Sequence, residues 1–204
     1  PPRSTLFPYT TLFRSNTVTA RLEGGLDKEM RWAGRLAQLK TAGQVALTLQ
    51  EAASLEISSA EVVLGAAELR SGEGRITLER TRWSPAQIVA RGRMSGLQVG
   101  LVRDASGKAR SSAGELRLGG EWDLALGERI NVLARLFRES GDLVLVGDSV
   151  ARLGLKRFEA VLSANDGRLA LSVDAEGEQL GKLVGSATAR SEEHTSELQS
   201  RQSI

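Results

Sequence analysis

The feature that most constrains the fold of this chain is an alternation of apolar and polar side chains with a period of two. The alternation is clearest in residues 115–126, ELRLGGEWDLAL. One set of alternate positions is apolar or glycine: Leu116, Leu118, Gly120, Trp122, Leu124 and Leu126. The positions between them are mostly charged. Because successive side chains of a β-strand point to opposite faces, the segment is predicted to form one long strand, or two strands broken at Gly119-Gly120, with one apolar and one solvated face.

The same alternation recurs along the chain and predicts further strands. It covers residues 17–23, 30–36, 44–50, 75–79 and 168–175. Residues 60–70 and 128–138 could each hold a helical turn on propensity alone. An isolated helix would have no neighbour to pack against, so we predict strands there as well.

Turn residues separate these runs. Asn165-Asp166-Gly167 is the strongest hairpin signal, because Asn, Asp and Gly tolerate the positive φ that a tight turn demands. Weaker signals lie at residues 71–74, 105–107, 140–142 and 176–177. The spacing of runs and turns predicts a meander of antiparallel strands, and no linker divides residues 16–189.

The two ends of the chain are set apart by their sequences. Residues 3–15, RSTLFPYTTLFRS, and residues 190–200, RSEEHTSELQS, resemble translated sequencing adapters at the two ends of a DNA insert. We therefore expect residues 1–15 and 190–204 to be disordered artefacts and residues 16–189 to be a segment of a larger protein. The single histidine, His194, and the single tyrosine, Tyr9, fall in these end segments.

Composition argues against most enzyme classes. The chain has no cysteine, and residues 16–189 have no histidine, so a Ser-His-Asp triad, a Cys-His pair and a His or Cys zinc site are not expected. The carboxylates Glu121 and Asp123 share one strand face, where solvated charges are common, and we predict no catalytic residue, no metal site and no cofactor. Lys and Arg number 27 against 25 Asp and Glu, a balance that gives no nucleic-acid footprint. No apolar run reaches the ~18 residues of a transmembrane helix.

Several phrases together resemble the middle region of the TamB family of bacterial translocation and assembly proteins. They are GELRLGGEWDLALG at residues 114–127, ERINVLARLFRESGDLVLVGD at 128–148, LGLKRFEAVLSA at 153–164 and NDGRLALSVDAEG at 165–177. The earlier phrases WAGRL at 32–36 and GRITLERTRW at 74–83 fit the same style. The resemblance rests on β-rich phrases and not on a catalytic motif.

This resemblance implies a specific fold, location and activity. It implies an elongated antiparallel sheet curled into an open gutter with an apolar interior. It also implies a parent protein that is anchored in the inner membrane, crosses the periplasm and partners a TamA-like outer-membrane protein. The expected activity is the movement of phospholipid between the membranes and support of outer-membrane protein assembly, without catalysis.

The residues themselves lead to a similar expectation, with alternatives. A sheet that is apolar on one face must bury that face against another sheet, itself or lipid. We predict that acyl chains contact Leu116, Leu118, Trp122, Leu124 and Leu126, and the competing interpretation is that these residues form an ordinary sheet core. A structural β-solenoid or sandwich, or an outer-membrane barrel segment, is the alternative without lipid transport. A barrel segment would carry aromatic girdles, which are sparse here, and a solenoid would show a fixed repeat, which is not evident. A glycan-active enzyme would need a carboxylate site that the sequence does not single out.

Overall fold

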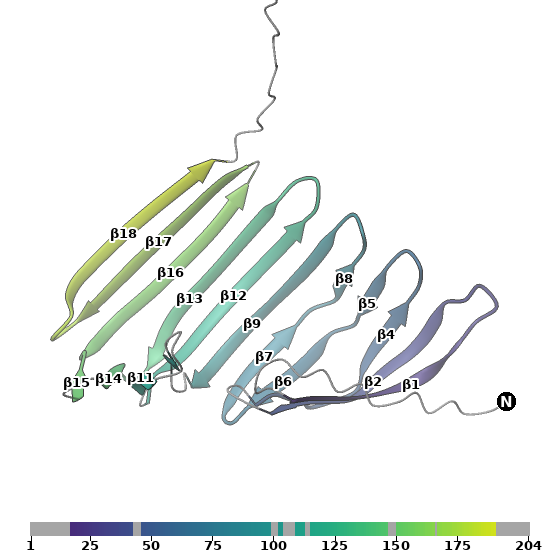
Figure 1. The fold of residues 1–204 in the computed structure, drawn as a ribbon, viewed down its shortest axis with the longest axis horizontal. Helices are drawn as coiled ribbons and strands as arrows, with labels where there is room; N and C mark the ends of the chain where they lie inside the picture. Colours follow the sequence, from purple (N-terminus) through teal and green to yellow (C-terminus); the bar gives the residue numbers. More distant parts are fainter. Residues whose placement is uncertain are drawn as a thin grey trace, which may run out of the picture.

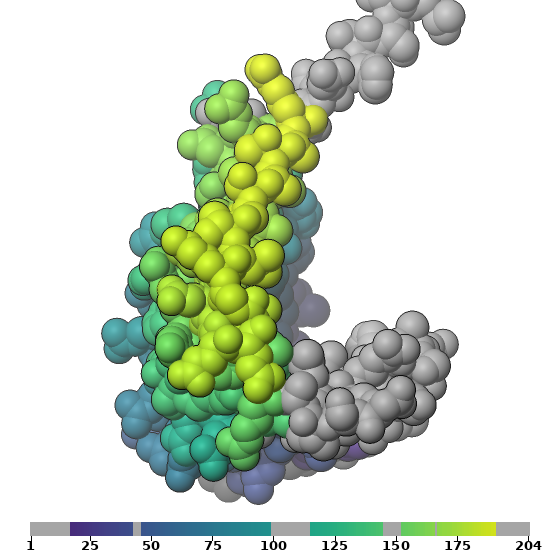
Figure 2. Space-filling model, turned by 90° about the vertical axis from the view of Figure 1, so that its left-hand side faces the viewer, coloured from purple at the N-terminus to yellow at the C-terminus, as the bar shows by residue number. Residues whose placement is uncertain are grey.

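The computed structural model describes residues 17–42, 46–98, 102–103, 109–112, 115–146, 150–165 and 167–190. These residues form strands and turns, with no helix among them. Fourteen strands make one antiparallel sheet, which lies in a single layer (Figure 1). The prediction of an all-β antiparallel fold is therefore confirmed. Seen from the β18 side, the layer is narrow and β18 bows along its length (Figure 2).

The strands of the main sheet are β1 (Thr17–Leu26), β2 (Trp32–Ala42), β3 (Thr48–Leu49), β4 (Ala53–Ile57), β5 (Val62–Leu64), β6 (Ala67–Ser71), β7 (Gly74–Leu78), β8 (Thr81–Trp83), β9 (Ile88–Gln98), β12 (Arg117–Leu126), β13 (Asn131–Ser140), β16 (Leu155–Asn165), β17 (Arg168–Gly177) and β18 (Gly181–Arg190). A second, four-stranded sheet consists of β10 (Val102–Arg103), β11 (Ala109–Ser112), β14 (Val144–Val146) and β15 (Val150–Arg152).

Six short strands of the main sheet join end to end as three long, broken strands. The three broken strands are β3 with β4, β5 with β6, and β7 with β8. Each half is hydrogen-bonded to the strands on either side of it. Backbone hydrogen bonds carry the ladder past the breaks: Gln50 N–H to Glu68 O at 2.9 Å, Gly65 N–H to Ser54 O at 2.8 Å, and Glu79 N–H to Arg91 O at 2.9 Å. The main sheet is thus a simple meander whose spatial order follows the chain.

A hydrophobic cluster lies along the line of these breaks. Its buried members are Leu49, Ala53, Ala67 and Leu69, which stand on either side of the breaks or opposite one another. A sheet bends where the pairing of its strands is irregular. The register of β1 with β2 shifts between Arg21 and Leu22, on the same line as the strand breaks. In Figure 1 the lower parts of β1 and β2 are seen edge-on and their upper parts are not, so these strands turn along their length.

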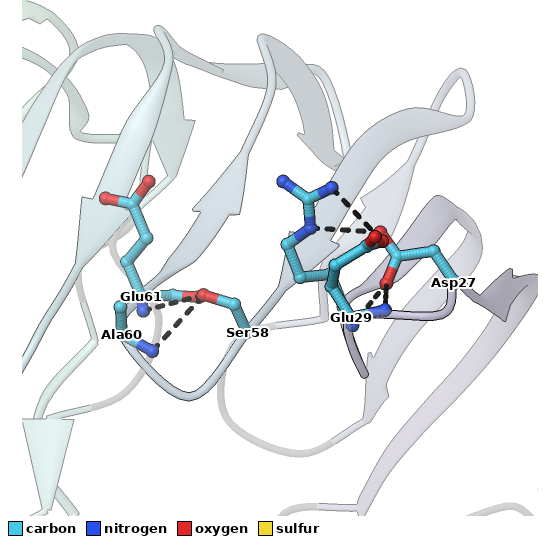
Figure 3. Close-up of polar contacts among 6 residues, drawn as sticks. Asp27, Glu29, Ser58, Ala60 and Glu61 are labelled. Carbon is cyan, nitrogen blue, oxygen red and sulfur yellow. Dashed lines mark hydrogen bonds and ion pairs between the residues drawn. The ribbon is translucent and has the colours of Figure 1, made fainter.

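Polar side chains close the hairpins at the upper edge of the sheet. The Asp27 carboxylate accepts hydrogen bonds from the Glu29 N–H at 2.9 Å and the Arg31 N–H at 2.8 Å. The Ser58 hydroxyl accepts from the Ala60 and Glu61 N–H groups in the next hairpin (Figure 3). Such side-chain bonds to nearby backbone stabilise turns without the Asn-Gly signature, so these two hairpins carry no strong turn signal in their sequences.

The lower end of the sheet is joined to the small sheet through Asp142. Its carboxylate accepts three backbone hydrogen bonds, from Leu155 at 2.7 Å, Leu143 at 2.8 Å and Gly154 at 3.0 Å. Beside it, buried Leu116 and Leu155 pack together, with other side chains around them: Leu118, Leu143, Phe158 and Leu180. This contact connects the chain leaving β13 to the start of β16.

Most strand and turn predictions agree with the structure. Residues 60–70 and 128–138 contribute strands and not helices, and Gly119-Gly120 lies inside the unbroken β12. Ser71 pairs with Gly74 and Asn165 pairs with Arg168, as predicted for tight hairpins, and φ is positive at Gly72 and Gly167.

Some predictions are wrong or fall outside the described residues. Met30, placed in a strand by the alternation, lies in the turn before β2 with a φ of 59°. Residues 140–142 begin the excursion to the small sheet instead of a hairpin between neighbouring strands. Residues 1–15, 105–107 and 191–204 lie outside the described residues, whereas Arg190 ends β18.

Replacement of Asp142 tests the connection at the lower end. Desolvation alone raises the pKa of Asp142, but the hydrogen bonds from Leu155, Gly154 and Leu143 outweigh it and hold the pKa below its ordinary value of 3.8. The stabilisation is therefore complete above that value and is lost as the pH falls through the folded-state pKa. We expect Asp142→Asn to lower the free energy of unfolding by roughly 1–2 kcal/mol near neutral pH, measured by urea unfolding.

The difference in the free energy of unfolding between wild type and Asp142→Asn should become smaller when the urea unfolding is repeated at acidic pH. Glu51→Gln, a change at an exposed carboxylate, serves as the control and should leave the unfolding curve unchanged. Equal stability of wild type and Asp142→Asn near neutral pH would contradict a stabilising role for these three hydrogen bonds.

Candidate functional site

One face of the main sheet is apolar from β1 to β18. Directly paired residues stand on the same face, so each row of partners can be followed across the strands. One row runs from Leu78 in β7 through Gly92, Trp122, Ala134, Leu162 and Leu171 to Ala187 in β18. The rows on either side run through Met94, Gly120, Leu136, Ala160, Val173 and Gly185, and through Ala90, Leu124, Val132, Ala164, Leu169 and Ala189.

The structure brings together four of the five residues predicted to contact lipid. Leu118, Trp122, Leu124 and Leu126 alternate along β12 on this apolar face. Leu116 precedes the strand and is only 5% exposed, because it packs against Leu155 at the lower end of the sheet. It therefore supports the end of the sheet and does not present a free surface.

Three large side chains on this face, Trp32, Met94 and Trp122, lie over glycines. A Cβ added to Gly92 would collide with Trp122 Cζ2 and would lie 2.8 Å from Trp122 Cε2, so the indole covers that glycine. Met94 covers Gly120 in the same way, and Trp32 covers both Gly24 and Gly34. Aromatic side chains that lie over glycines cover the exposed backbone there.

A shallow depression of about 210 Å³ lies beside the Trp122 indole. Its walls include Met94, Trp122, Leu136 and Leu171, and the small residues Ala134 and Ala160 lie among them. The depression is larger than the ~150 Å³ apolar cavity that accommodates benzene in another protein. Its lining can accept hydrocarbon but offers few hydrogen bonds.

The apolar face is open in the C-terminal half of the described chain. Leu169, Leu171 and Leu183 are 44%, 41% and 53% exposed, although all three stand on this face. The buried cluster near β3 and β6 shows that the N-terminal half is packed more closely. Large contiguous apolar surface is uncommon on soluble monomers, so this region is the candidate site among the described residues.

The opposite face carries rows of ion pairs. Arg91 Nε lies 2.8 Å from Asp123 Oδ2, Arg135 Nε lies 2.7 Å from Glu159 Oε1, and Arg157 Nη2 lies 3.2 Å from Asp174 Oδ2. The hydrogen bond from Arg135 is the main cause that lowers the pKa of Glu159.

An aromatic ring also lies on this polar face. Phe137 lies against Gly119, and the Arg135 guanidinium carbon is 5.0 Å from the ring centre. The Arg135 guanidinium therefore lies over this ring. Leu133 and Val184, which are 56% and 66% exposed, also stand on this face, each opposite an aspartate.

The described residues show few features of other kinds of site. They contain no group of three or more His, Asp or Glu side chains placed to hold a metal ion. They also contain no helix long and apolar enough to cross a membrane.

The sequence analysis does not predict that Arg138 lies on the apolar face. Arg138 pairs with Leu118 and so stands on the apolar face of β13, following Ala134 and Leu136 at alternate positions. The alternation in residues 132–138 could have indicated this, but the helical propensity of the segment concealed its period.

Comparison of the chain with protein-family models, with curated proteins and with solved structures finds no match.

Substitution of the glycine beneath Trp122 tests how the apolar face is built. Gly92→Ala would place a methyl group against the indole and 2.7 Å from the Thr77 carbonyl oxygen, a backbone atom that cannot easily move. We expect a loss of about 1–3 kcal/mol in the free energy of unfolding, by thermal or urea denaturation. Gly185→Ala is the matched control, because no atom lies within 4 Å of the added group on the same face. If both variants lose the same stability, the indole does not lie on Gly92.

Proposed function

We propose that the apolar face of this sheet binds the acyl chains of phospholipids and forms a segment of a lipid conduit. The observation that carries the proposal is the separation of the two faces over the whole main sheet. One face is apolar from strand to strand and is open around Leu169, Leu171 and Leu183, and the other carries ion pairs. In a single layer, the open apolar face gains stability from whatever removes it from water.

An apolar face of this kind would let a bound acyl chain move along the sheet. Each buried CH₂ group of an acyl chain contributes about 0.8 kcal/mol, and a uniformly apolar surface offers nearly the same gain at every row. A chain can therefore shift from one strand to the next without a deep energy minimum. With the three broken strands counted once each, the strands at about 4.8 Å spacing extend over roughly 50 Å.

The broken strands support a concave apolar face. The breaks between β3 and β4, β5 and β6, and β7 and β8 lie side by side, and the buried cluster of Leu49, Ala53, Ala67 and Leu69 lies along them. A sheet bent toward this cluster would have the shape of an open gutter with an apolar interior.

The resemblance to the TamB family extends the proposal to the cell. By that resemblance, the parent protein would be anchored in the inner membrane, cross the periplasm and act with a TamA-like outer-membrane protein. It would move phospholipid between the membranes and support outer-membrane protein assembly, with no catalytic residue and no cofactor.

A structural scaffold is the second candidate function. It is favoured by the packed N-terminal half, where Leu49, Ala53, Ala67 and Leu69 are each 9% exposed or less without a lipid present. In that case the apolar face is covered by protein throughout, and it does not take up acyl chains.

Photocrosslinking distinguishes the two functions. A photoreactive amino acid is placed at Trp122 or Leu171 on the apolar face, or at Asp123 or Ser172 on the polar face as controls. The protein is irradiated with vesicles of phosphatidylethanolamine and phosphatidylglycerol, and lipid adducts are measured by mass spectrometry. We expect adducts at the first pair, several-fold above the controls. Equal yields on both faces, or no adduct at any position, would rule out the conduit and favour the scaffold.

A further inference from the structure

Arg138 is the one charged side chain that the described strand pairing places on the apolar face of the main sheet. It stands opposite Leu118 near the lower end of β13. On the same face of the same strand, Val132, Ala134 and Leu136 precede it. A permanent cation at the margin of an apolar surface is costly unless an anion or hydrogen-bond acceptors surround it.

The contacts of Arg138 leave part of its charge uncompensated. Its Nε donates to the Gly141 carbonyl oxygen at 2.8 Å, and its Nη1 donates to the Lys156 carbonyl oxygen at 3.1 Å. Both acceptors are neutral backbone groups, and no ion pair among the described residues includes Arg138. A guanidinium group has five N–H donors, so about three remain for another ligand.

The apolar depression lies a short distance along the same strand. Ala134 and Leu136 line it, and Ala134 is four residues from Arg138, a separation of about 13 Å along an extended strand. A ligand that occupied both would be an amphiphile with a hydrocarbon chain at one end and an anion at the other. Arginine binds phosphate through paired N–H groups, which makes a phosphate headgroup the best match.

We propose that Arg138 binds the phosphate of a phospholipid whose acyl chain lies in the depression beside Trp122. This inference rests on the proposed lipid-binding function and adds a fixed orientation to it, with the headgroup at the lower edge of the sheet. It also makes the lower end of β13 a place where a lipid pauses on an otherwise uniform track.

A purely structural role for Arg138 would predict different behaviour. Its bonds to Gly141 and Lys156 connect the ends of β13 and β16, so its removal could loosen that edge. A loosened edge would weaken the binding of every lipid, whereas a lost phosphate contact would weaken only lipids that carry phosphate. The test therefore compares two lipids with identical acyl chains.

The experiment uses phosphatidylglycerol and diacylglycerol that carry the same photoreactive acyl chain, with the full chain as protein. In Arg138→Gln, labelling of the apolar face by phosphatidylglycerol should fall about tenfold, because a charge-assisted contact is lost, and labelling by diacylglycerol should not change. Arg138→Lys keeps the charge but not the paired donors. Its labelling by phosphatidylglycerol should lie between the labelling of wild type and that of Arg138→Gln. Arg93→Gln, which removes a cation from the polar face, is the matched control and should behave as wild type.

Each other outcome overturns the proposal. If labelling by both lipids falls equally in Arg138→Gln, the residue has a structural role. If labelling by both lipids is unchanged, the headgroup binds elsewhere. Displacement of phosphatidylglycerol by an equal concentration of inorganic phosphate would indicate a site for free anions. If neither lipid labels the wild-type protein, the proposed function fails together with this inference. Thermal unfolding of each variant verifies that the compared proteins are folded.

Discussion

A single antiparallel layer satisfies backbone hydrogen bonds between its strands but cannot bury its apolar face by itself. Pairing between successive strands holds β9 to β18 together as far as the described chain shows, and the small sheet lies at one end of them. What remains is a surface with large exposed leucines on β17 and β18. The exposed apolar face on which the proposed function relies is therefore a direct consequence of a layer that is one sheet thick.

The shape of that surface is set by small residues and by breaks in the strands. The Trp122 indole lies over Gly92, and Trp32 lies over Gly24 and Gly34, so these large side chains cover the backbone at the glycines. The breaks in the short strands lie side by side across the sheet. A larger residue at Gly24, Gly34 or Gly92 would collide with the ring that lies over it, so the ring or the backbone would have to move.

Local alternation made much of this fold predictable. The faces of β12 and β17 follow directly from alternate leucines and charges, and the tight turn at Gly167 follows from its Asn-Asp-Gly sequence. The breaks at residues 50–52, 65–66 and 79–80 were not predictable, because they depend on long-range pairing and carry no common signature. The small sheet pairs two segments that are distant in sequence, so local alternation does not predict it. The position of Arg138 on the apolar face likewise follows from its pairing with Leu118.

Fluorescence quenching by phospholipids brominated in the acyl chain shows whether acyl chains lie against the apolar face. In a protein with Trp32 and Trp83 replaced by Phe, Trp122 is the remaining tryptophan. We predict that its emission is quenched by lipids brominated in the middle of the chain. A tryptophan moved to position 121, on the polar face, should be unaffected. Quenching at position 121 equal to that at Trp122, or no quenching at either, would contradict the account.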